Sequence, residues 1–336
     1  MRIILAIIAL AVAAWVGWWF LLATAKDRAI EGWLAARREA GWVAEATEVS
    51  VGGFPYRLDT LLTGVELSNP AGGWSWTAPE FRLHALAYQP NHLIAVWPHD
   101  QTFATLFGRA RILSEDMRGS VVVEPNLRLG LRRTTIELDG LRVRGETTGW
   151  EIGLAHGQVA LRQAEGENPP PNAYDLAFTA ENLTLPKGWL AFDGGGLLDQ
   201  AIEVASVRAT ATFDRPLDRL AIEETPPLIR TLRVDDMTFT WGRLDLRGKG
   251  RLEADAQGFA SGRLDLRARN WREMVDVAER SGAINATLAS ALRGGLGLIA
   301  RLGGDRNVIE APLDFSGGFM RLGPIPLGPA PRLSIR

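Results

Sequence analysis

The chain has 336 residues, with 37 Lys and Arg against 39 Asp and Glu, so its net charge is close to zero. A chain without excess positive charge lacks the basic surface of nucleic-acid-binding proteins, and no nucleic-acid partner is expected. There is no cysteine. Disulfide bonds, thiolate catalysis, cysteine-ligated zinc and lipoprotein acylation are therefore excluded.

Residues 3–25 are apolar throughout apart from Thr24. At about 1.5 Å per residue, a helix of this length spans the roughly 30 Å hydrocarbon core of a bilayer. Near one end lies a cluster typical of an aromatic belt, made of Trp15, Trp18, Trp19 and Phe20. We predict an uncleaved transmembrane signal anchor over residues 1–25. The alternative is a signal peptide cleaved after Ala25, but the apolar run is long for one and is bulky near the cleavage site.

Basic residues flank this stretch unevenly. Arg2 precedes it, whereas Lys26, Arg28, Arg37 and Arg38 follow it, and a strict count would place the following chain in the cytoplasm. A large β-rich body behind a short N-terminal tail is instead typical of an exported signal-anchor protein. We expect a single-pass protein of the bacterial inner membrane with most of its chain in the periplasm.

Residues 26–46 are predicted to form a membrane-proximal helix, because Ile30, Trp33 and Leu34 fall at helical spacing. We expect this helix to pack on the body. The alternative is a helix on the membrane surface, which its mixed charges disfavour.

From Glu48 onward, short runs alternate apolar and polar residues between Gly, Pro, Asn and Asp. Phe54, Tyr56 and Leu58 share one face, for example. This pattern predicts a mainly β chain with an antiparallel sheet and few helices. Two helices are expected near the C-terminus, over residues 271–280 and 285–302, the first between Asn270 as N-cap and Ser281-Gly282 as stop. The proline-rich tail predicts an edge or closing segment.

The hexapeptide GRLDLR occurs twice, at residues 242–247 and 262–267. Its apolar residues alternate, and Gly248-Lys249-Gly250 and Gln257-Gly258 resemble turns. We therefore predict that the two copies flank the middle strand of a meander and point the same way. The change of apolar parity at Gly242 predicts a β-bulge there. The charged residues predict a solvated face with cross-strand ion pairs.

A longer repeat relates residues 62–85 to residues 138–161, which align without a gap at an offset of 76. The copies share a glycine at Gly64 and Gly140 and a Gly-Trp pair at Gly73 and Gly149. Their opening phrase recurs at Ala180 and at Val234. Duplicated strand-turn units predict a lengthened sheet, in the form of a curved sheet or groove.

Residues 164–174 contain three prolines with polar flanks and no periodicity. They are either a boundary or a long loop. As a boundary they divide the body into an N-terminal β lobe with the internal repeat, 47–164, and a C-terminal β lobe with helices, 172–336.

Candidates for chemistry are few. His84, His92 and His99 recur every seven or eight residues, but in a β region such spacing puts them on different strands or turns, so no metal site is predicted. Asp235-Asp236 is more typical of a strand-entry turn than of a cation site. No nucleophile–base pair or Gly-x-Ser-x-Gly elbow is visible, so we predict no enzyme activity and no cofactor.

Several stretches carry a family resemblance: "GFPYRLD" after a W…R…G helix, "GWSWTAPEF", "RARNWREMVDVAERSGAI" and "LGPIPLGPAP". Together they resemble the bacterial family called domain of unknown function 2125. The resemblance implies inner-membrane-anchored periplasmic proteins, more distantly similar to AsmA-like proteins. That wider group is associated with outer-membrane biogenesis and phospholipid transfer along an apolar β-groove. The resemblance carries no catalytic residues.

We therefore predict a non-enzymatic envelope protein that contacts or carries membrane lipid. The alternative is an envelope scaffold or assembly protein that binds other proteins through its strand edges. The predicted lipid groove comprises Phe81, Leu83, Ala85, Val159, Leu161, Leu244, Leu246, Leu264 and Leu266. For these same-face residues the alternative is a dry core against the C-terminal helices.

Overall fold

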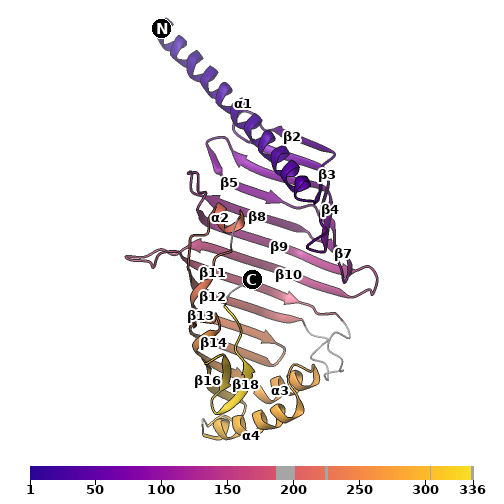
Figure 1. The fold of residues 1–336 in the computed structure, drawn as a ribbon, viewed down its shortest axis with the longest axis vertical. Helices are drawn as coiled ribbons and strands as arrows, with labels where there is room; N and C mark the ends of the chain where they lie inside the picture. Colours follow the sequence, from indigo (N-terminus) through magenta and orange to yellow (C-terminus); the bar gives the residue numbers. More distant parts are fainter. Residues whose placement is uncertain (187–200, 224–225, 303, 334–336) are drawn as a thin grey trace. The chain divides into compact units, whose positions relative to one another are not determined.

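The computed structural model describes residues 1–186, 201–223, 226–302 and 304–333. Within these ranges it contains four helices and eighteen strands, and the strand pairings are antiparallel (Figure 1). A long apolar helix lies at the N-terminus and two helices lie near the C-terminus. The prediction of a mainly β chain with these helices is confirmed.

The chain divides into two compact units. Unit 1 comprises residues 1–123 and 138–150, and unit 2 comprises residues 124–137 and 151–336. The division passes through strand β9 (Leu131–Gly145). The proline-rich residues 164–172 lie inside unit 2, where they form the loop between two successive strands.

Unit 1 contains the N-terminal helix and the first strands. Their bounds are α1 (Arg2–Glu39), β1 (Val43–Glu45), β2 (Glu48–Gly52), β3 (Asp59–Asn69), β4 (Trp74–Leu86), β5 (Gln89–Val96), β6 (Asp100–Thr105), β7 (Gly108–Leu113) and β8 (Asp116–Val123). Strand β3 pairs with β1, β2 and β4, while β4 pairs with β5 at one end and with β6 at the other. Helix α1 lies along these strands (Figure 1).

Helix α1 ends earlier than predicted, so the range 26–46 was wrong at its C-terminal end. The helix stops at Glu39, and Gly41 follows with a positive φ of 83° that favours glycine. From Val43 the chain pairs with β3, and Ala44 is completely buried opposite Leu67. Burial against the sheet therefore outweighs continuation of the helix.

Unit 2 contains the remaining elements. Their bounds are β10 (Glu151–Gln163), β11 (Ala173–Leu183), β12 (Ile202–Phe213), α2 (Arg219–Glu223), β13 (Ile229–Trp241), β14 (Leu244–Ala254), β15 (Ala260–Arg269), α3 (Trp271–Arg280), α4 (Ala286–Leu302), β16 (Val308–Ser316), β17 (Phe319–Leu322) and β18 (Ile325–Pro329). Each strand from β10 to β17 pairs with the next strand in the chain. The proline-rich strand β18 pairs with β17 alone among the described strands, as an edge.

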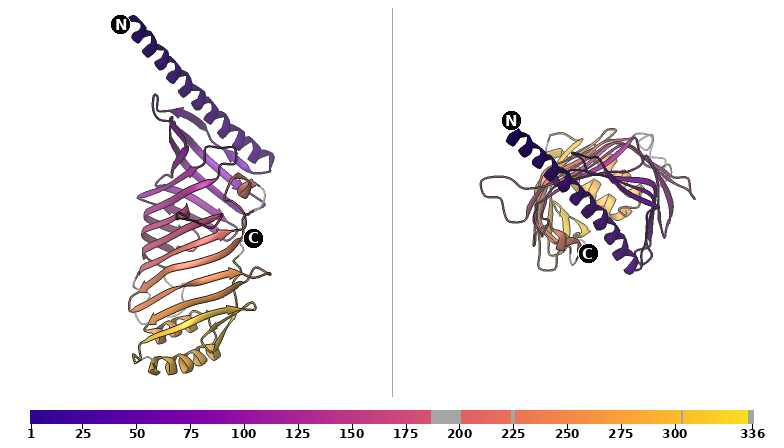
Figure 2. Two further views of the ribbon diagram at one scale, coloured as in Figure 1. Left: turned by 90° about the vertical axis from the view of Figure 1, so that its left-hand side faces the viewer. Right: turned by 90° about the horizontal axis from the view of Figure 1, so that it is seen from above.

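Helices α3 and α4 pack against the last strands of the unit 2 sheet (Figure 2). Trp271 of α3 and Leu296 of α4 are buried in one core with Ala268 and Ile309 of the sheet. The bounds of α3 agree with the prediction, since Asn270 is its N-cap residue and Gly282 follows its end with a φ of 75°.

The two GRLDLR copies lie on neighbouring antiparallel strands, so the predicted three-strand arrangement was wrong. Gly248 and Gly250 lie inside β14, which runs unbroken to Ala254. A Cβ at Gly248 would collide with the ends of Met237 and Leu266, so this glycine makes room for packing rather than for a turn. Gly242 was also mispredicted, because it lies in the tight turn between β13 and β14, not in a bulge.

The longer repeat is visible in the backbone. Gly64 and Gly140 have φ of 57° and 56°, and Gly73 and Gly149 both have φ of 66°. Asn182, at the same place in the recurring phrase, has φ of 52°. A left-handed residue inside a strand favours Gly or Asn, which explains Gly64, Gly140 and Asn182. Asp236, at the same place in the copy at Val234, does not have a positive φ.

Candidate apolar pocket

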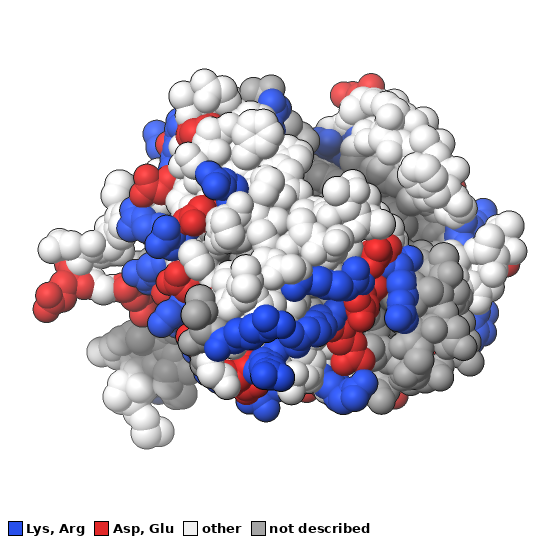
Figure 3. All heavy atoms as spheres, turned by 90° about the horizontal axis from the view of Figure 1, so that it is seen from below, with Lys and Arg blue, Asp and Glu red and all other residues white. Residues whose placement is uncertain are grey.

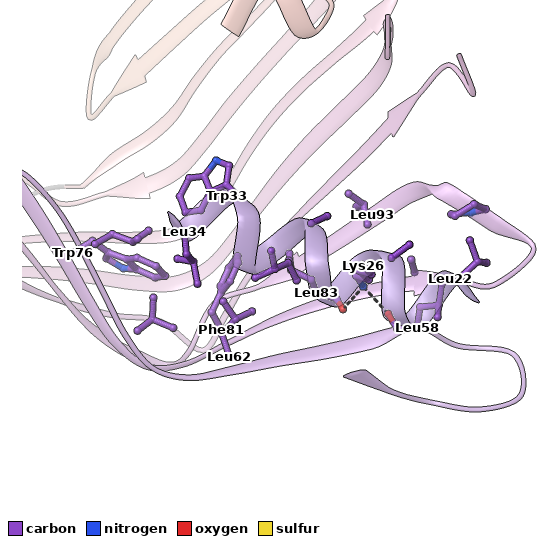
Figure 4. A pocket seen from close by; sticks show the side chains of 17 residues that line it. Leu22, Lys26, Trp33, Leu34, Leu58, Leu62, Trp76, Phe81, Leu83 and Leu93 are labelled. Atoms are coloured by element: carbon purple, nitrogen blue, oxygen red, sulfur yellow. Dashed lines mark hydrogen bonds between the residues drawn. The ribbon is translucent and has the colours of Figure 1, made fainter. Parts of the chain in front are cut away.

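An apolar pocket of about 520 Å³ lies between α1 and strands β3, β4 and β5 of unit 1 (Figure 4). Seventeen residues line it. Helix α1 contributes Leu22, Ala25, Lys26, Ala29, Ile30, Trp33 and Leu34. The strands and their loops contribute Leu58, Leu62, Val65, Leu67, Trp76, Phe81, Leu83, Ala85, Pro90 and Leu93.

The helical wall follows from sequence spacing. Its members recur at three and four residues, so they form one stripe along α1. Ala25 and Ala29 are the small members of that stripe, and their short side chains leave room that Leu or Ile would fill. On the opposite wall the apolar residues alternate along β3 and β4, and the rings of Trp76 and Phe81 meet edge to face at 5.7 Å.

Lys26 is the one ionisable residue among those lining the pocket. Its Nζ donates hydrogen bonds to the carbonyl oxygens of Leu58 at 2.7 Å and Leu83 at 3.2 Å. Burial lowers the pKa of Lys26 to about 8, and the carboxylate of Asp59 partly opposes this shift. The ammonium is thus bonded to the strand backbone at the pocket wall, and the rest of the lining stays apolar.

Three tryptophans attach α1 to the body beside the pocket. The indole N–H groups of Trp15, Trp18 and Trp19 donate to the carbonyl oxygens of Pro55, Ala87 and Arg57 at 3.0, 3.2 and 2.7 Å. Trp19 and Ala23 are buried against Leu58, Ala85 and Ala87. The sequence predicted these tryptophans as part of an aromatic belt at the membrane. The structure shows in addition that they hold the helix on the body, which the sequence pattern did not reveal.

Three predicted groove residues, Phe81, Leu83 and Ala85, line this pocket from β4. The helical stripe and the residues of β3 were missing from the prediction. The stripe was visible in the spacing of Ile30, Trp33 and Leu34, but its partner strands follow only from the chain reversal after Glu39.

The other six predicted residues belong to unit 2 and share one face of its sheet. Val159 and Leu266 lie in one row of paired residues that runs through Phe178, Val207, Met237 and Gly248. Leu161 and Leu264 lie in the next row, which runs through Leu176, Ala209, Val234 and Gly250. Val159 and Phe178 are 46% and 43% exposed, so part of this face is open.

Three leucines of that face are packed in cores, whereas Leu161 and Leu266 are partly buried and belong to none of these cores. Leu244 is buried with Ile202 and Trp241, and Leu246 packs on the core formed with α3 and α4. Leu264 packs against Leu252 and Phe315. At these three leucines the structure has the packing of a core.

Charged residues occupy the other face of the same strands. The ion pairs Arg263–Asp314 and Arg267–Glu310 join β15 to β16, which confirms the predicted cross-strand ion pairs. Acidic and basic side chains are interspersed at the surface (Figure 3). Each pair is more than a third exposed at one or both partners, so we expect little stabilisation from it.

The three histidines considered as metal ligands have separate partners. His84 bonds to Asp59, His92 to Ser120 and His99 to the carbonyl oxygen of Ser114. Within the described residues, no group of three His, Cys, Asp or Glu side chains is placed to hold a metal ion.

Helix α1 is the one helix of the described chain that is long and apolar enough to cross a membrane. This finding is compatible with a single-pass anchor at the N-terminus.

Comparison with curated proteins found no match, and comparison with solved structures found none either. A family model described as "Uncharacterized protein conserved in bacteria (DUF2125)" matches residues 19–331. The matched range begins at the buried Trp19 and includes the whole strand wall of the pocket. The chain belongs to this bacterial DUF2125 family.

Proposed function

We propose that this chain is a non-enzymatic, AsmA-like protein of the bacterial inner membrane whose pocket in unit 1 binds an acyl chain of a membrane lipid. In this proposal α1 is an uncleaved anchor and the body lies in the periplasm. One observation carries it: the helix that is apolar enough to enter a bilayer also forms one wall of an apolar pocket.

The size and chemistry of the pocket support an acyl chain as ligand. Its volume of about 520 Å³ falls within the roughly 300–1,000 Å³ typical of small-molecule sites. Its lining offers almost no hydrogen-bonding groups, because the Lys26 ammonium is already bonded to two carbonyl oxygens. An apolar ligand gains free energy there by leaving water, whereas a polar ligand would lose hydrogen bonds without replacement.

The packing of α1 supports retention of the anchor. Cleavage after Ala25 would remove Leu22 and Ala25 from the pocket wall. It would also remove the buried Trp19 and Ala23 and expose Leu58 and Ala87. A body without residues 1–25 would therefore lose part of its core as well as its anchor.

Filling the pocket tests the proposal. Ala29→Phe places a ring at the pocket wall from an exposed helical position, so the protein should fold but bind less lipid. Ala36→Phe is the matched control, because Ala36 is exposed on the same helix and does not line the pocket. The full chain is purified in mild detergent and its bound lipid is quantified by mass spectrometry.

The proposal predicts lipid on the wild type and on Ala36→Phe, and a loss of at least several-fold on Ala29→Phe. Equal lipid on all three proteins would contradict the pocket as the site. A wild-type protein without lipid would contradict lipid binding altogether and leave the binding of envelope proteins through strand edges as the remaining prediction.

A further inference from the structure

Exposed aromatic side chains surround the place where α1 first meets the body of unit 1. Phe20, Phe54, Tyr56 and Tyr88 are 58%, 52%, 63% and 62% exposed, and we call these four residues the aromatic collar. Phe20 belongs to α1, Phe54 and Tyr56 lie in the loop before β3, and Tyr88 lies in the turn before β5. The rings of Phe20 and Phe54 stack at 6.4 Å, and the backbone N–H of Ala87 donates to the carbonyl oxygen of Tyr56, so the two loops adjoin.

The part of α1 that is free of the body is too short to cross a bilayer alone. Residues 3–14 are exposed, and Trp15 makes the first side-chain hydrogen bond to the body. Twelve residues cover about 18 Å, whereas the hydrocarbon core is roughly 30 Å thick. Arg2 bounds the apolar stretch on its other side, since a cation at the bilayer centre is costly. The missing length therefore falls on residues 15–22, which lie against the two loops.

The body is fastened to this segment. The three indole hydrogen bonds hold the helix to the loop carbonyls of Pro55, Arg57 and Ala87. In an apolar medium those carbonyls have no water to replace the indoles, so separating loop and helix would leave unsatisfied polar groups. When residues 15–22 enter the membrane, the loops enter with them.

We propose that the aromatic collar enters the bilayer through its interfacial layer, with Phe20 nearest the headgroups and Tyr56, whose ring lies 6.4 Å from that of Trp15, deeper, so that unit 1 is partly immersed on the body's side of the membrane. The chemistry of the loops suits this partner. Residues 53–56 and 87–91 carry no charge, and aromatic rings favour the level of the lipid headgroups. Arg57 borders the collar with a side chain that is 57% exposed, and its charge is already paired with Asp59 at 2.9 Å.

This inference rests on the anchor in the proposed function but not on lipid in the pocket. It adds a route for the ligand. The pocket begins at Leu22, two residues after Phe20, so an acyl chain can pass from the immersed collar to the pocket without crossing water.

The absence of cysteine makes a depth measurement direct. Single cysteines at Phe54→Cys and Tyr88→Cys are labelled with an environment-sensitive fluorophore in the full chain. Phe107→Cys is the control, because Phe107 is a fully exposed aromatic residue at the other end of the unit 1 sheet. There Trp74 contacts Trp42, which follows the C-terminal end of α1. The proteins are reconstituted in phosphatidylethanolamine and phosphatidylglycerol vesicles that contain phosphatidylcholine with a doxyl quencher near the headgroup.

The collar predicts quenching at positions 54 and 88 that is at least twofold stronger than at position 107. Tyr88→Cys keeps the test independent of the packing of Phe54 on Trp19. Equal quenching at all three positions in protein that resists alkaline extraction would overturn the collar and leave the pocket proposal standing. Extraction of the protein by alkaline carbonate would overturn the anchor and the collar together. Strong collar quenching in a protein that carries no lipid would support the collar and contradict the pocket.

Discussion

Four polar side chains of α1 near the pocket have hydrogen-bond partners on the strands or loops. Three indole N–H groups and the Lys26 ammonium all donate to backbone carbonyl oxygens between Pro55 and Ala87. A helix that packs on a sheet beside a membrane gains from such bonds, because water cannot replace them there. Lys26 differs from the indoles because its ammonium is charged and can lose a proton.

Lys26 should make stability depend on pH above neutrality. Its pKa is about 8 in the folded protein, against 10.5 for an unperturbed lysine. Between these values the unfolded state binds more protons than the folded state, so the free energy of unfolding rises as pH increases from about 8 to 10.5. Thermal unfolding of the full chain in detergent, compared with that of Lys26→Met, should show this rise in the wild type alone. A parallel pH dependence in both proteins would refute the assignment.

At the scale of elements, the structure shows where sequence patterns suffice. Helix α3 agreed with its prediction because Asn270 and Gly282 mark its ends, and alternation identified the strands. The glycines of β14 misled, because glycine is common both in turns and where packing leaves no room for a Cβ. At Gly248 the cause is packing, because the side chains of Met237 and Leu266 occupy the space of a Cβ. Their positions depend on strand pairing, which no local sequence pattern encodes.

Helix α4 offers a matched pair of leucines for testing its packing. Leu296 is 2% exposed in the core against the sheet, whereas Leu298, two residues later, is 62% exposed. Leu296→Ala should lower the free energy of unfolding by about 2–5 kcal/mol, because it removes buried methyl groups and leaves a cavity. Leu298→Ala should change it by less than about 0.5 kcal/mol. Denaturant unfolding of both variants measures the difference, and similar losses would show that α4 does not pack as described.

At the scale of the molecule, the sequence predicted the β-rich body, the apolar N-terminal helix and three residues of the pocket. It did not predict that one helix would serve both as a membrane-compatible segment and as a pocket wall. That arrangement arises from the chain reversal between Glu39 and Val43, which sets β1 against β3 while α1 lies along the strands beside it. The six predicted residues of unit 2 share a face as expected, and burial separates those in a core from the half-exposed Val159.

The central claim is that an acyl chain occupies the pocket between α1 and the strands of unit 1. Photo-crosslinking in living cells tests it most directly, with p-benzoylphenylalanine in place of Phe81, which lines the pocket, or of Phe107, which does not. After irradiation, mass spectrometry of the purified protein should find a lipid adduct on the peptide with residue 81 and none on the peptide with residue 107. A peptide with residue 81 that carries no lipid, in folded protein retained in the membrane, would contradict the account.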